Sequence, residues 1–251
     1  MTQLLCIRSK ECKNDLLLND PVISPYLPQT LPLNLVNLQK MILRYETVYV
    51  KPDVGSSGFG IYRIERLQPN QYLLRSQTTK VMQGTSAELG QATMKIGRKK
   101  PYLLQQGIQS LTTRGLPFDL RVHMQRVNGE WVYGGAVGKL GKRYGVVTNR
   151  FRGGQPVPIE TLLAHHLNRS PIQQKSLMEE IKRVAFRIAR LMQKRFPYPR
   201  EYGIDIGIDN KQLWIYEVNT SPGITVFRKL SDHRPVKRIL LHRRQGNIKR
   251  R

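Results

Sequence analysis

The segment GIDIGIDNKQLWIYEVNTSPG, residues 203–223, constrains the fold of this chain most strongly, because it combines two strand patterns with a short polar turn. The alternation of apolar residues predicts a β-hairpin whose strands are joined by a turn at 210–212. A turn of that length places Asp205 directly opposite Glu217, with their Cβ atoms about 5 Å apart. Asn219 follows Glu217 by two positions, so both side chains face the same side of the strand. The sequence therefore predicts two carboxylates and one amide on a single surface.

These side chains offer oxygen donors of the kind that Mg²⁺ prefers when it also binds a phosphate. Carboxylates directly opposite one another would destabilise the hairpin if no cation lay between them. The alternative is that Asp205 and Glu217 pair with some of the 42 Lys and Arg residues of the chain. We favour the metal site, whose predicted ligands are Asp205, Glu217 and Asn219.

A glycine-rich loop lies in the segment VYVKPDVGSSGFGIYRI, with strand patterns on both of its sides. A P-loop or a dinucleotide fingerprint would require a helix after the glycines, so neither fits. A glycine-rich hairpin can still fold over phosphates and offer them backbone N–H groups. Lys51, on the incoming strand, would add a point charge to the same anion. An ordinary flexible hairpin is the alternative. The residues of the predicted phosphate-binding flap are Gly55, Ser56, Ser57, Gly58 and Gly60.

A third group of polar residues lies on the predicted strand 118–127, which alternates between apolar and polar positions. Arg121 offers a rigid fork for a phosphate or a carboxylate. A surface salt bridge between Asp119 and Arg121 is the alternative, and we interpret His123 as a packed strand residue rather than a catalyst. The residues grouped with this polar face are Lys139, Asn149, Arg152, Gly153 and Gly154.

The formal net charge of +25 arises from 42 Lys and Arg residues against 17 Asp and Glu residues in 251. Residues 228–251 contain ten Lys or Arg and one acid, so the excess is enriched in this tail but is not confined to it. Such a tail either binds a polyanion or is a solvated end. A basic chain also suggests nucleic-acid binding. No recognised nucleic-acid motif supports that function, and the tail lacks interleaved aromatic residues.

Composition excludes several classes of protein. A hydrophobic fraction of 39% is too high for a disordered chain. No apolar run approaches the roughly 20 residues that a membrane span needs, which excludes an integral membrane protein. The N-terminus lacks an apolar signal core, so we expect no secretion. Cys6 and Cys12 are too few for a disulfide scaffold or a zinc site, and they are consistent with a reducing interior.

The spacing of apolar residues predicts the remaining elements. The helix at 170–196 has the clearest signals, because Ser170, Pro171 and Gln173 form a capping pattern at its start. Two further helices are predicted at 35–45 and 86–95. Strands are predicted at 46–51, 59–67, 102–105, 118–127, 131–137, 203–209 and 213–219.

Taken in order, the motifs resemble the ATP-grasp superfamily, and most closely its YheC/YheD-type, endospore-coat-associated branch. YEVNTSPG is also similar to a segment of D-alanine–D-alanine ligases, and the DLR, Asn and Gly-Gly elements are similar to RimK-type ligases. The segments that carry the resemblance are Ser9-Lys10, LPQT at 27–30, VYVKPDVGSSGFGIYRI, YLLQQGI at 102–108, FDLRV at 118–122, TNRFRGG at 148–154 and YEVNTSPG at 216–223.

This resemblance implies an α+β fold of the ATP-grasp type, in which two α+β subdomains with antiparallel sheets hold ATP between them. We expect a helical and loop lead-in at 1–46 and a small subdomain with the glycine-rich flap at 47–106. A large subdomain with the metal site is expected at 107–230, followed by the basic tail at 231–251.

The resemblance also implies roles for individual residues. Lys51 and Lys10 would contact the phosphates of ATP, and main-chain groups of Gln106 and Gly107 would contact adenine. Mg²⁺ would be held by the acidic hairpin. The residues that would face the transferred phosphate or the acceptor are Arg121, Asn149 and Lys139, the last at a position that is commonly arginine in relatives.

The function that the resemblance implies is a Mg²⁺- and ATP-dependent ligase that joins a carboxylate to an amine or a thiol through an acylphosphate. The basic charge suggests a polyanionic acceptor. The alternatives are an ATP-grasp phosphotransferase and a non-catalytic, spore-associated protein that binds an anionic polymer. The implied location is the cytoplasm, with association with the spore coat in a spore-forming bacterium.

Overall fold

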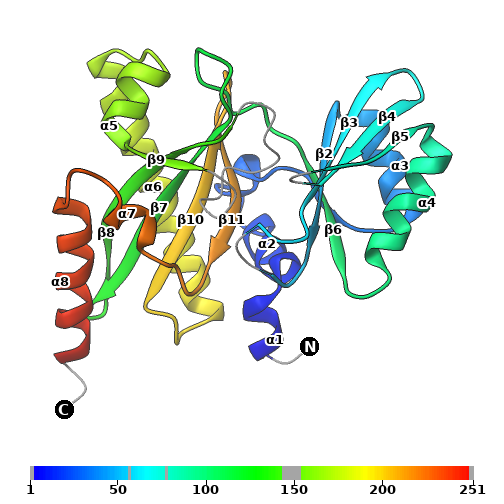
Figure 1. Cartoon of the computed structure of the whole chain (residues 1–251). Helices are drawn as coiled ribbons and strands as arrows, with labels where there is room; N and C mark the ends of the chain where they lie inside the picture. The colour runs from blue at the N-terminus through cyan, green and yellow to red at the C-terminus, as the bar shows by residue number, and fades with distance from the viewer. Residues whose placement is uncertain (1–2, 56–57, 77–78, 143–153, 249–251) are drawn as a thin grey trace.

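The computed structural model describes residues 3–55, 58–76, 79–142 and 154–248, and it contains two antiparallel sheets, each with its own helices (Figure 1). The predicted α+β class with two antiparallel sheets is therefore confirmed. Within the described residues, no helix has both the length and the apolar character that crossing a bilayer would require.

The first sheet has six strands in the order β1-β6-β2-β3-β4-β5. All of its neighbouring strands are antiparallel. Helices α3 and α4 lie together on one side of it (Figure 1), and residues from both share its apolar core. The strands are β1 (Thr30–Pro32), β2 (Thr47–Pro52), β3 (Tyr62–Gln68), β4 (Gln71–Arg75), β5 (Lys80–Gly84) and β6 (Tyr102–Gln106), and the helices are α3 (Leu35–Arg44) and α4 (Ser86–Gly97).

The second sheet has five strands in the order β11-β10-β7-β8-β9. Its main apolar core lies between one face of the sheet and the long helix α6. The strands are β7 (Phe118–Val127), β8 (Glu130–Leu140), β9 (Gln155–Pro158), β10 (Glu201–Ile208) and β11 (Leu213–Asn219), and the helical segments beside them are α5 (Ile159–Thr161), the π-helical turn η3 (Leu162–His166) and α6 (Pro171–Arg195).

Helix α6 begins and ends where the sequence predicts. The Ser170 side chain accepts a hydrogen bond from the Gln173 N–H, and the Gln173 side chain binds the Ser170 N–H in return. Pro197 follows the helix and prevents its continuation. The buried residues recur at helical spacing, so a single apolar face meets the sheet. These residues are Ile181, Val184, Ala185, Ile188, Ala189 and Met192.

Replacing Ile188 tests how much this face contributes to stability. Ile188 is fully buried in the core of the second sheet. We expect Ile188→Ala to lower the free energy of unfolding by about 2–5 kcal/mol, because it removes apolar contacts and leaves a cavity. Urea denaturation followed by circular dichroism measures this change. Arg190→Ala, on the exposed face of the same helix, should shift the value by less than about 0.5 kcal/mol.

The C-terminal residues form helix α8 (Arg234–Ile248), so a largely solvated tail is the wrong interpretation for this part of the chain. Val236 and Ile239 lie three positions apart and are buried together with Phe227 of the short helix α7 (Thr225–Arg228). Gln125 of β7 donates a hydrogen bond to the Ile239 carbonyl. Because Gln125 and its neighbour Met124 point to opposite faces of the sheet, α8 covers the face that α6 leaves open.

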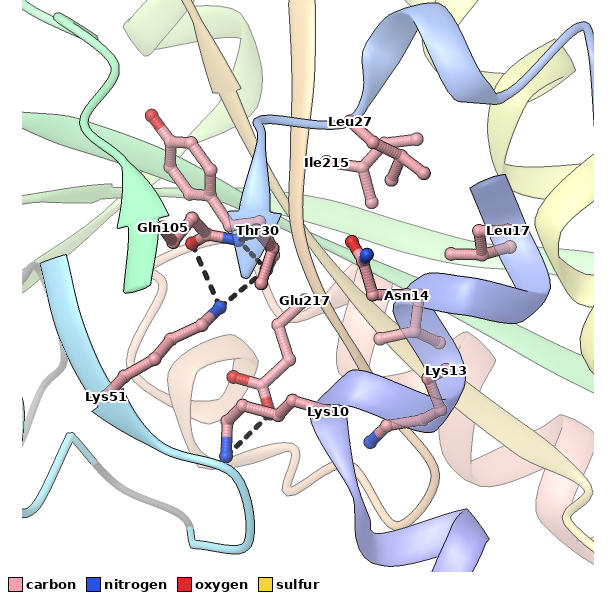
Figure 2. A pocket seen from close by; sticks show the side chains of 12 residues that line it. Lys10, Lys13, Asn14, Leu17, Leu27, Thr30, Lys51, Gln105, Ile215 and Glu217 are labelled. Atoms are coloured by element: carbon pink, nitrogen blue, oxygen red, sulfur yellow. Dashed lines mark hydrogen bonds and ion pairs between the residues drawn. The ribbon is translucent and has the colours of Figure 1, made fainter. Parts of the chain in front are cut away.

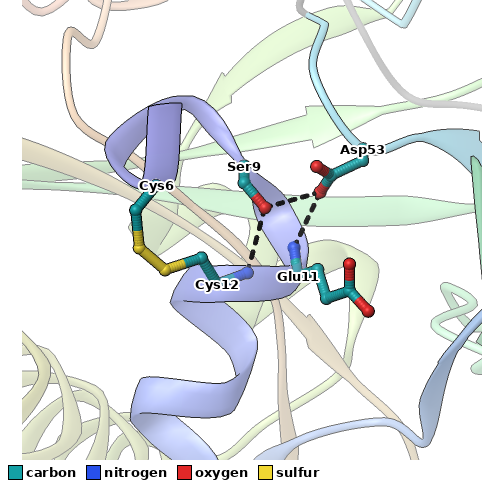
Figure 3. Close-up of a disulfide and its surroundings, with 5 residues drawn as sticks. All are labelled: Cys6, Ser9, Glu11, Cys12 and Asp53. Atoms are coloured by element: carbon teal, nitrogen blue, oxygen red, sulfur yellow. Dashed lines mark hydrogen bonds between the residues drawn. A yellow bond between two sulfur atoms is a disulfide. The ribbon is translucent and has the colours of Figure 1, made fainter. Parts of the chain in front are cut away.

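The N-terminal helices α1 (Gln3–Arg8) and α2 (Lys10–Leu18) meet at Ser9, and η1 (Ser24–Tyr26) follows them. At this junction the Cα atoms of Cys6 and Cys12 lie 5.5 Å apart, and their sulfur atoms form a disulfide (Figure 3). The reduced state expected for these cysteines is thus not the state in the structure. The close approach of two short helices, which the spacing did not reveal, brings the pair within disulfide range.

Candidate functional site

The acidic hairpin places its two carboxylates opposite each other, as predicted. Asp205 of β10 pairs with Glu217 of β11. The predicted three-residue turn is wrong, however, because Ile208 already pairs with Leu213 and four residues lie between them. A β-bulge after Asp205 inserts one additional residue on β11 and so restores the predicted pairing.

Asp205 is bound by basic side chains. Arg121 donates from Nε to Oδ1 at 2.8 Å and from Nη2 to Oδ2 at 2.9 Å. Lys139 Nζ donates to Oδ1 at 3.0 Å, and Asn219 Nδ2 donates to Oδ2 at 3.1 Å. Burial opposes the charged carboxylate, but the two cations outweigh this effect and hold the pKa of Asp205 well below its ordinary value. Asp205 is therefore ionised. In this structure it pairs with Arg121 and Lys139, which is the alternative to the metal site that the sequence left open.

The polar face of β7 continues this network. Lys139 Nζ also lies 2.7 Å from Asp119 Oδ1, so one lysine bridges two acids. The salt bridge that the sequence left open between Asp119 and Arg121 is replaced by these cross-strand pairs. His123 is fully buried with its ring edge against Phe227 at a centroid distance of 5.8 Å, which agrees with its interpretation as a packed residue.

Three lysine side chains gather around the other carboxylate, Glu217 (Figure 2). Lys10, Lys13 and Lys51 are exposed over only 9%, 6% and 7% of their surfaces. Glu217 retains 25% exposure, and its Oε1 lies 3.8 Å from Lys10 Nζ. The sequence singled out Lys10 and Lys51 but missed Lys13. Glu217 and Asp53 are the acids whose charges act on Lys13, so three buried ammonium groups still outnumber the carboxylates on this side of the site.

Lys51 extends from β2 toward β6 and β11 (Figure 2). Its Nζ donates to Gln105 Oε1 at 2.9 Å and to the Tyr216 carbonyl at 3.3 Å. Both acceptors are neutral, and no acid within the described residues forms an ion pair with Lys51. Burial lowers the pKa of Lys51 to about 8. Lys51 is thus a buried cation with no direct carboxylate partner in the described part of the chain, although the nearby charges of Glu217 and Asp205 oppose part of the lowering of its pKa.

Lys10 connects the glycine-rich loop to the acidic hairpin. Asp53 accepts hydrogen bonds from Ser9 Oγ at 2.9 Å and from the Glu11 N–H at 2.8 Å, which fixes the start of α2 (Figure 3). Lys10 Nζ then donates to the carbonyls of Asp53 at 3.2 Å and Gly55 at 2.9 Å. The predicted phosphate ligand Lys10 therefore lies at the base of the predicted flap.

Within the loop itself, Gly58 and Gly60 have φ angles of 75° and 71°, a region that favours glycine. A Cβ on Gly60 would also lie 2.9 Å from Tyr102 Oη. The backbone conformation of the loop therefore favours glycine at both positions, whether or not these residues contact a ligand. Five other residues singled out from the sequence lie outside the described residues: Ser56, Ser57, Asn149, Arg152 and Gly153.

The two residues predicted to contact adenine lie at the end of β6, where Gln106 is the last residue of the strand and Gly107 follows it. The Gln106 N–H donates to the Gln29 carbonyl at 2.8 Å, and the Gly107 N–H donates to the Thr47 carbonyl at 2.9 Å. Both N–H groups are thus used within the protein, so a base bound here would have to meet other main-chain atoms of this segment.

The described residues contain no cluster of three or more His, Cys, Asp and Glu side chains that could hold a metal ion. Asp205, Glu217 and Asn219 nevertheless provide two carboxylates and an amide side by side, a donor set that suits Mg²⁺. For Asp205 to bind the ion, Arg121 and Lys139 would have to share or release its oxygens. The residues present therefore fit Mg²⁺ by type.

Comparison with known proteins gives one family match. The YheC/D-like ATP-grasp family model matches residues 6–243. The endospore coat-associated protein YheD of Bacillus subtilis (strain 168) is 25% identical over 224 residues, which is 85% of this chain and 48% of that protein. The chain thus spans about half the length of this curated relative.

The solved structures with a similar fold include a synthetase and a ligase. D-cycloserine synthetase DcsG has a TM-score of 0.60 at 12% identity, over 96% of this chain and 71% of that chain. D-alanine–D-alanine ligase from Bacillus anthracis, solved in complex with ATP, has a TM-score of 0.54 at 12% identity, over 96% and 67%. At such low identities, the likeness shows the fold, and function has to be argued from the site.

Proposed function

Because this chain belongs to the YheC/D-like ATP-grasp family, we propose that it is a Mg²⁺- and ATP-dependent ligase that joins a carboxylate to an amine or a thiol. The observation that carries the proposal is the excess positive charge around Glu217. Burying a charged group without a partner is costly, so such groups persist where a ligand supplies the opposite charge. A triphosphate next to Lys10, Lys13 and Lys51 would provide that charge.

The proposed reaction has two steps. A carboxylate oxygen of the acceptor attacks the γ-phosphorus of ATP, ADP leaves, and an acylphosphate forms. The amine or thiol then attacks the acyl carbon, inorganic phosphate leaves, and the nucleophile loses its proton. Catalysis of this kind depends mainly on positioning and on neutralising the charge of the phosphates.

The residues of the site divide these tasks. Lys10 and Lys51 would hold phosphate oxygens at the base of the glycine-rich flap. Arg121 and Lys139 would exchange part of their contact with Asp205 for the transferred phosphoryl group or the acceptor carboxylate. Asp205, Glu217 and Asn219 would hold Mg²⁺, which supplies charge neutralisation for the β- and γ-phosphates.

ADP release against a panel of amino acids, peptides and anionic polymers tests the proposal, since a ligase should release ADP only with its acceptor. Hydroxylamine added to the productive mixture should give a hydroxamate by trapping the acylphosphate. Phosphorylation of a hydroxyl without a hydroxamate would instead show a phosphotransferase. Calorimetry that detects no Mg·ATP binding at micromolar to millimolar concentration would favour a non-catalytic binding protein.

The similarity to YheD, an endospore coat-associated protein, supports a proposed place at the spore coat. A fluorescent fusion should move from the cytoplasm to the forespore surface during sporulation of a spore-forming host. A fusion that stays diffuse throughout sporulation would argue against this location.

The lowered pKa of Lys51 makes ATP affinity depend on pH. The protonated ammonium binds phosphate, and its proton is lost above a pKa of about 8 in the free protein. We therefore expect the Kd for ATP to rise by up to about tenfold per pH unit above this pKa and to change little just below it. Isothermal titration calorimetry measures the profile. Lys51→Arg should flatten it, because guanidinium stays charged, and identical profiles for the two proteins would contradict the role of Lys51.

A further inference from the structure

A separate cavity of about 300 Å³ lies at the end of the second sheet, between the start of β10, the loop after β11 and helix α8. Its lining is rich in arginine and lacks large apolar side chains. The residues that matter for its chemistry are Arg126, Arg200, Glu201, Ser221, His242 and Arg243.

The acid of this cavity, Glu201, is already neutralised. Arg243 donates to both of its oxygens at 2.7 Å, and Gln125 Nε2 donates to Oε1 at 2.8 Å. Burial favours the neutral acid, but the nearby His123 ring at 3.7 Å and the hydrogen bonds from Arg243 and Gln125 lower the pKa of Glu201 to about 2. Arg243 and Glu201 therefore form a closed pair that anchors α8 and leave no net charge.

The two other arginines are oriented without being neutralised. Arg126 Nη2 donates to the Pro197 carbonyl at 2.9 Å, and Arg200 Nη1 donates to the Gly246 carbonyl. Neither forms an ion pair with any acid of the described residues. Both guanidinium groups are thus fixed by main-chain atoms and keep their full charge at the cavity, which favours a carboxylate or a phosphate as ligand.

The cavity adjoins the acidic hairpin through a single loop. Asn219 binds Asp205, and the next three residues, Thr220, Ser221 and Pro222, line the cavity. Along β10, Asp205 and Glu201 are four residues apart, which corresponds to about 13 Å in an antiparallel strand. A ligand that reaches from the cavity to the acidic hairpin would span roughly this distance.

We propose that the cavity binds a remote carboxylate of an acidic oligopeptide, and that this peptide is the acceptor in the ligase reaction proposed above. The proposal rests on that function. A single amino acid is too short to reach both places, whereas an extended peptide of about four residues covers about 13 Å. Arginine binds a carboxylate or a phosphate through two parallel hydrogen bonds. We choose the carboxylate because the acceptor of the proposed ligase already carries that group, and the competing phosphate ligands are tested below.

Fluorescence anisotropy with fluorescein-labelled tetraglutamate, without nucleotide, tests the cavity directly. We expect Arg200→Ala and, separately, Arg126→Ala to raise the Kd of the peptide at least about tenfold, the loss typical of a charge-assisted hydrogen bond. Arg200→Lys should recover part of the affinity, because it keeps the charge but not the fork. The matched control is Arg244→Ala, which removes an exposed charge from helix α8 outside the cavity and should change the Kd less than about twofold. Thermal melts of every variant by circular dichroism establish folding.

Three results would overturn this inference: equal losses in Arg244→Ala and Arg200→Ala, equal affinity for free glutamate and tetraglutamate, or tighter binding of a labelled oligonucleotide or polyphosphate of the same charge. The binding assay needs no ATP, so it separates the two proposals. Specific peptide binding without ADP release would leave the cavity assignment standing and would count against the ligase. If Arg200→Ala releases ADP with acceptors as fast as the wild type, the ligase proposal would stand and the cavity assignment would be contradicted.

Discussion

In the Glu217→Ala variant, binding of Mn²⁺ together with ATP and any ATP turnover are expected to disappear while the fold is retained. Glu217 supplies one of the two proposed metal carboxylates. Its removal should be tolerated structurally, because it is 25% exposed and its one ion pair is a loose contact of 3.8 Å with Lys10. Electron paramagnetic resonance of free and bound Mn²⁺ measures the first effect without knowledge of the acceptor. ADP release measures the second.

Two comparisons make this result specific. Glu130→Ala removes an exposed carboxylate from the same sheet and should leave Mn²⁺ binding and turnover unchanged. Asp205→Ala is the less informative variant, because it would leave Arg121 and Lys139 without their shared acid and could unfold the protein. Wild-type Mn²⁺·ATP affinity or full turnover in a folded Glu217→Ala protein would exclude the proposed metal role.

The sequence predicted those parts of the fold whose signals are local. For helix α6, the capping residue Ser170, the periodic apolar residues and the following Pro197 all lie in one continuous segment, so its start, end and buried face could be predicted. Strands β4 and β5 were missed, because their apolar and polar positions do not form the continuous pattern that indicates a buried strand. Helix α8 was also missed, because its many charges concealed Val236 and Ile239, the residues that attach it to the sheet.

The site shows the same division. The pairing of Asp205 with Glu217 was predictable, since both belong to one hairpin. The bidentate contact of Arg121 with Asp205 was not, because the two residues are 84 positions apart and meet only through the pairing of β7 with β10. Lys13 carried a local signal, since it lies three residues after Lys10 and so shares its helix face. Lys13 could not be assigned to the site because the sequence does not show that α2 packs beside the acidic hairpin.

The net charge of +25 gains a more specific meaning from these positions. Part of the charge is neutralised within the fold, as with Arg121, Lys139 and Arg243. Another part exceeds its acidic partners: it is buried beside Glu217, and it is half-buried in the cavity next to α8. An excess of cations at two separate places indicates a ligand system with several anionic groups, and a nucleotide together with an acidic acceptor meets that requirement.

Lys51→Met should weaken ATP binding and at the same time stabilise the free protein. Losing a charge-assisted contact to phosphate should raise the Kd for ATP by about tenfold to a hundredfold. The stability effect has the opposite sign. Burial lowers the pKa of Lys51 to about 8 from 10.5, so folding is opposed wherever the lysine is charged, which includes pH 7. This cost amounts to about 3 kcal/mol, and the two lost hydrogen bonds offset about 2 kcal/mol of it. We expect a net gain of about 1 kcal/mol in the free energy of unfolding.

Calorimetry with ATP and urea denaturation of the ligand-free protein measure the two effects. A purely structural lysine would give the opposite outcome, with lower stability and unchanged ATP affinity. Lys40→Met, at an exposed position of α3, is the matched control and should alter neither quantity. Raising the pH toward 10 should reverse the sign of the stability difference and make Lys51→Met the less stable protein by about 1 kcal/mol, because neutralising the buried lysine removes most of its charge cost while the lost hydrogen bonds still count. A difference that persists unchanged at high pH would show that side-chain packing, and not the charge of Lys51, sets the stability of this site.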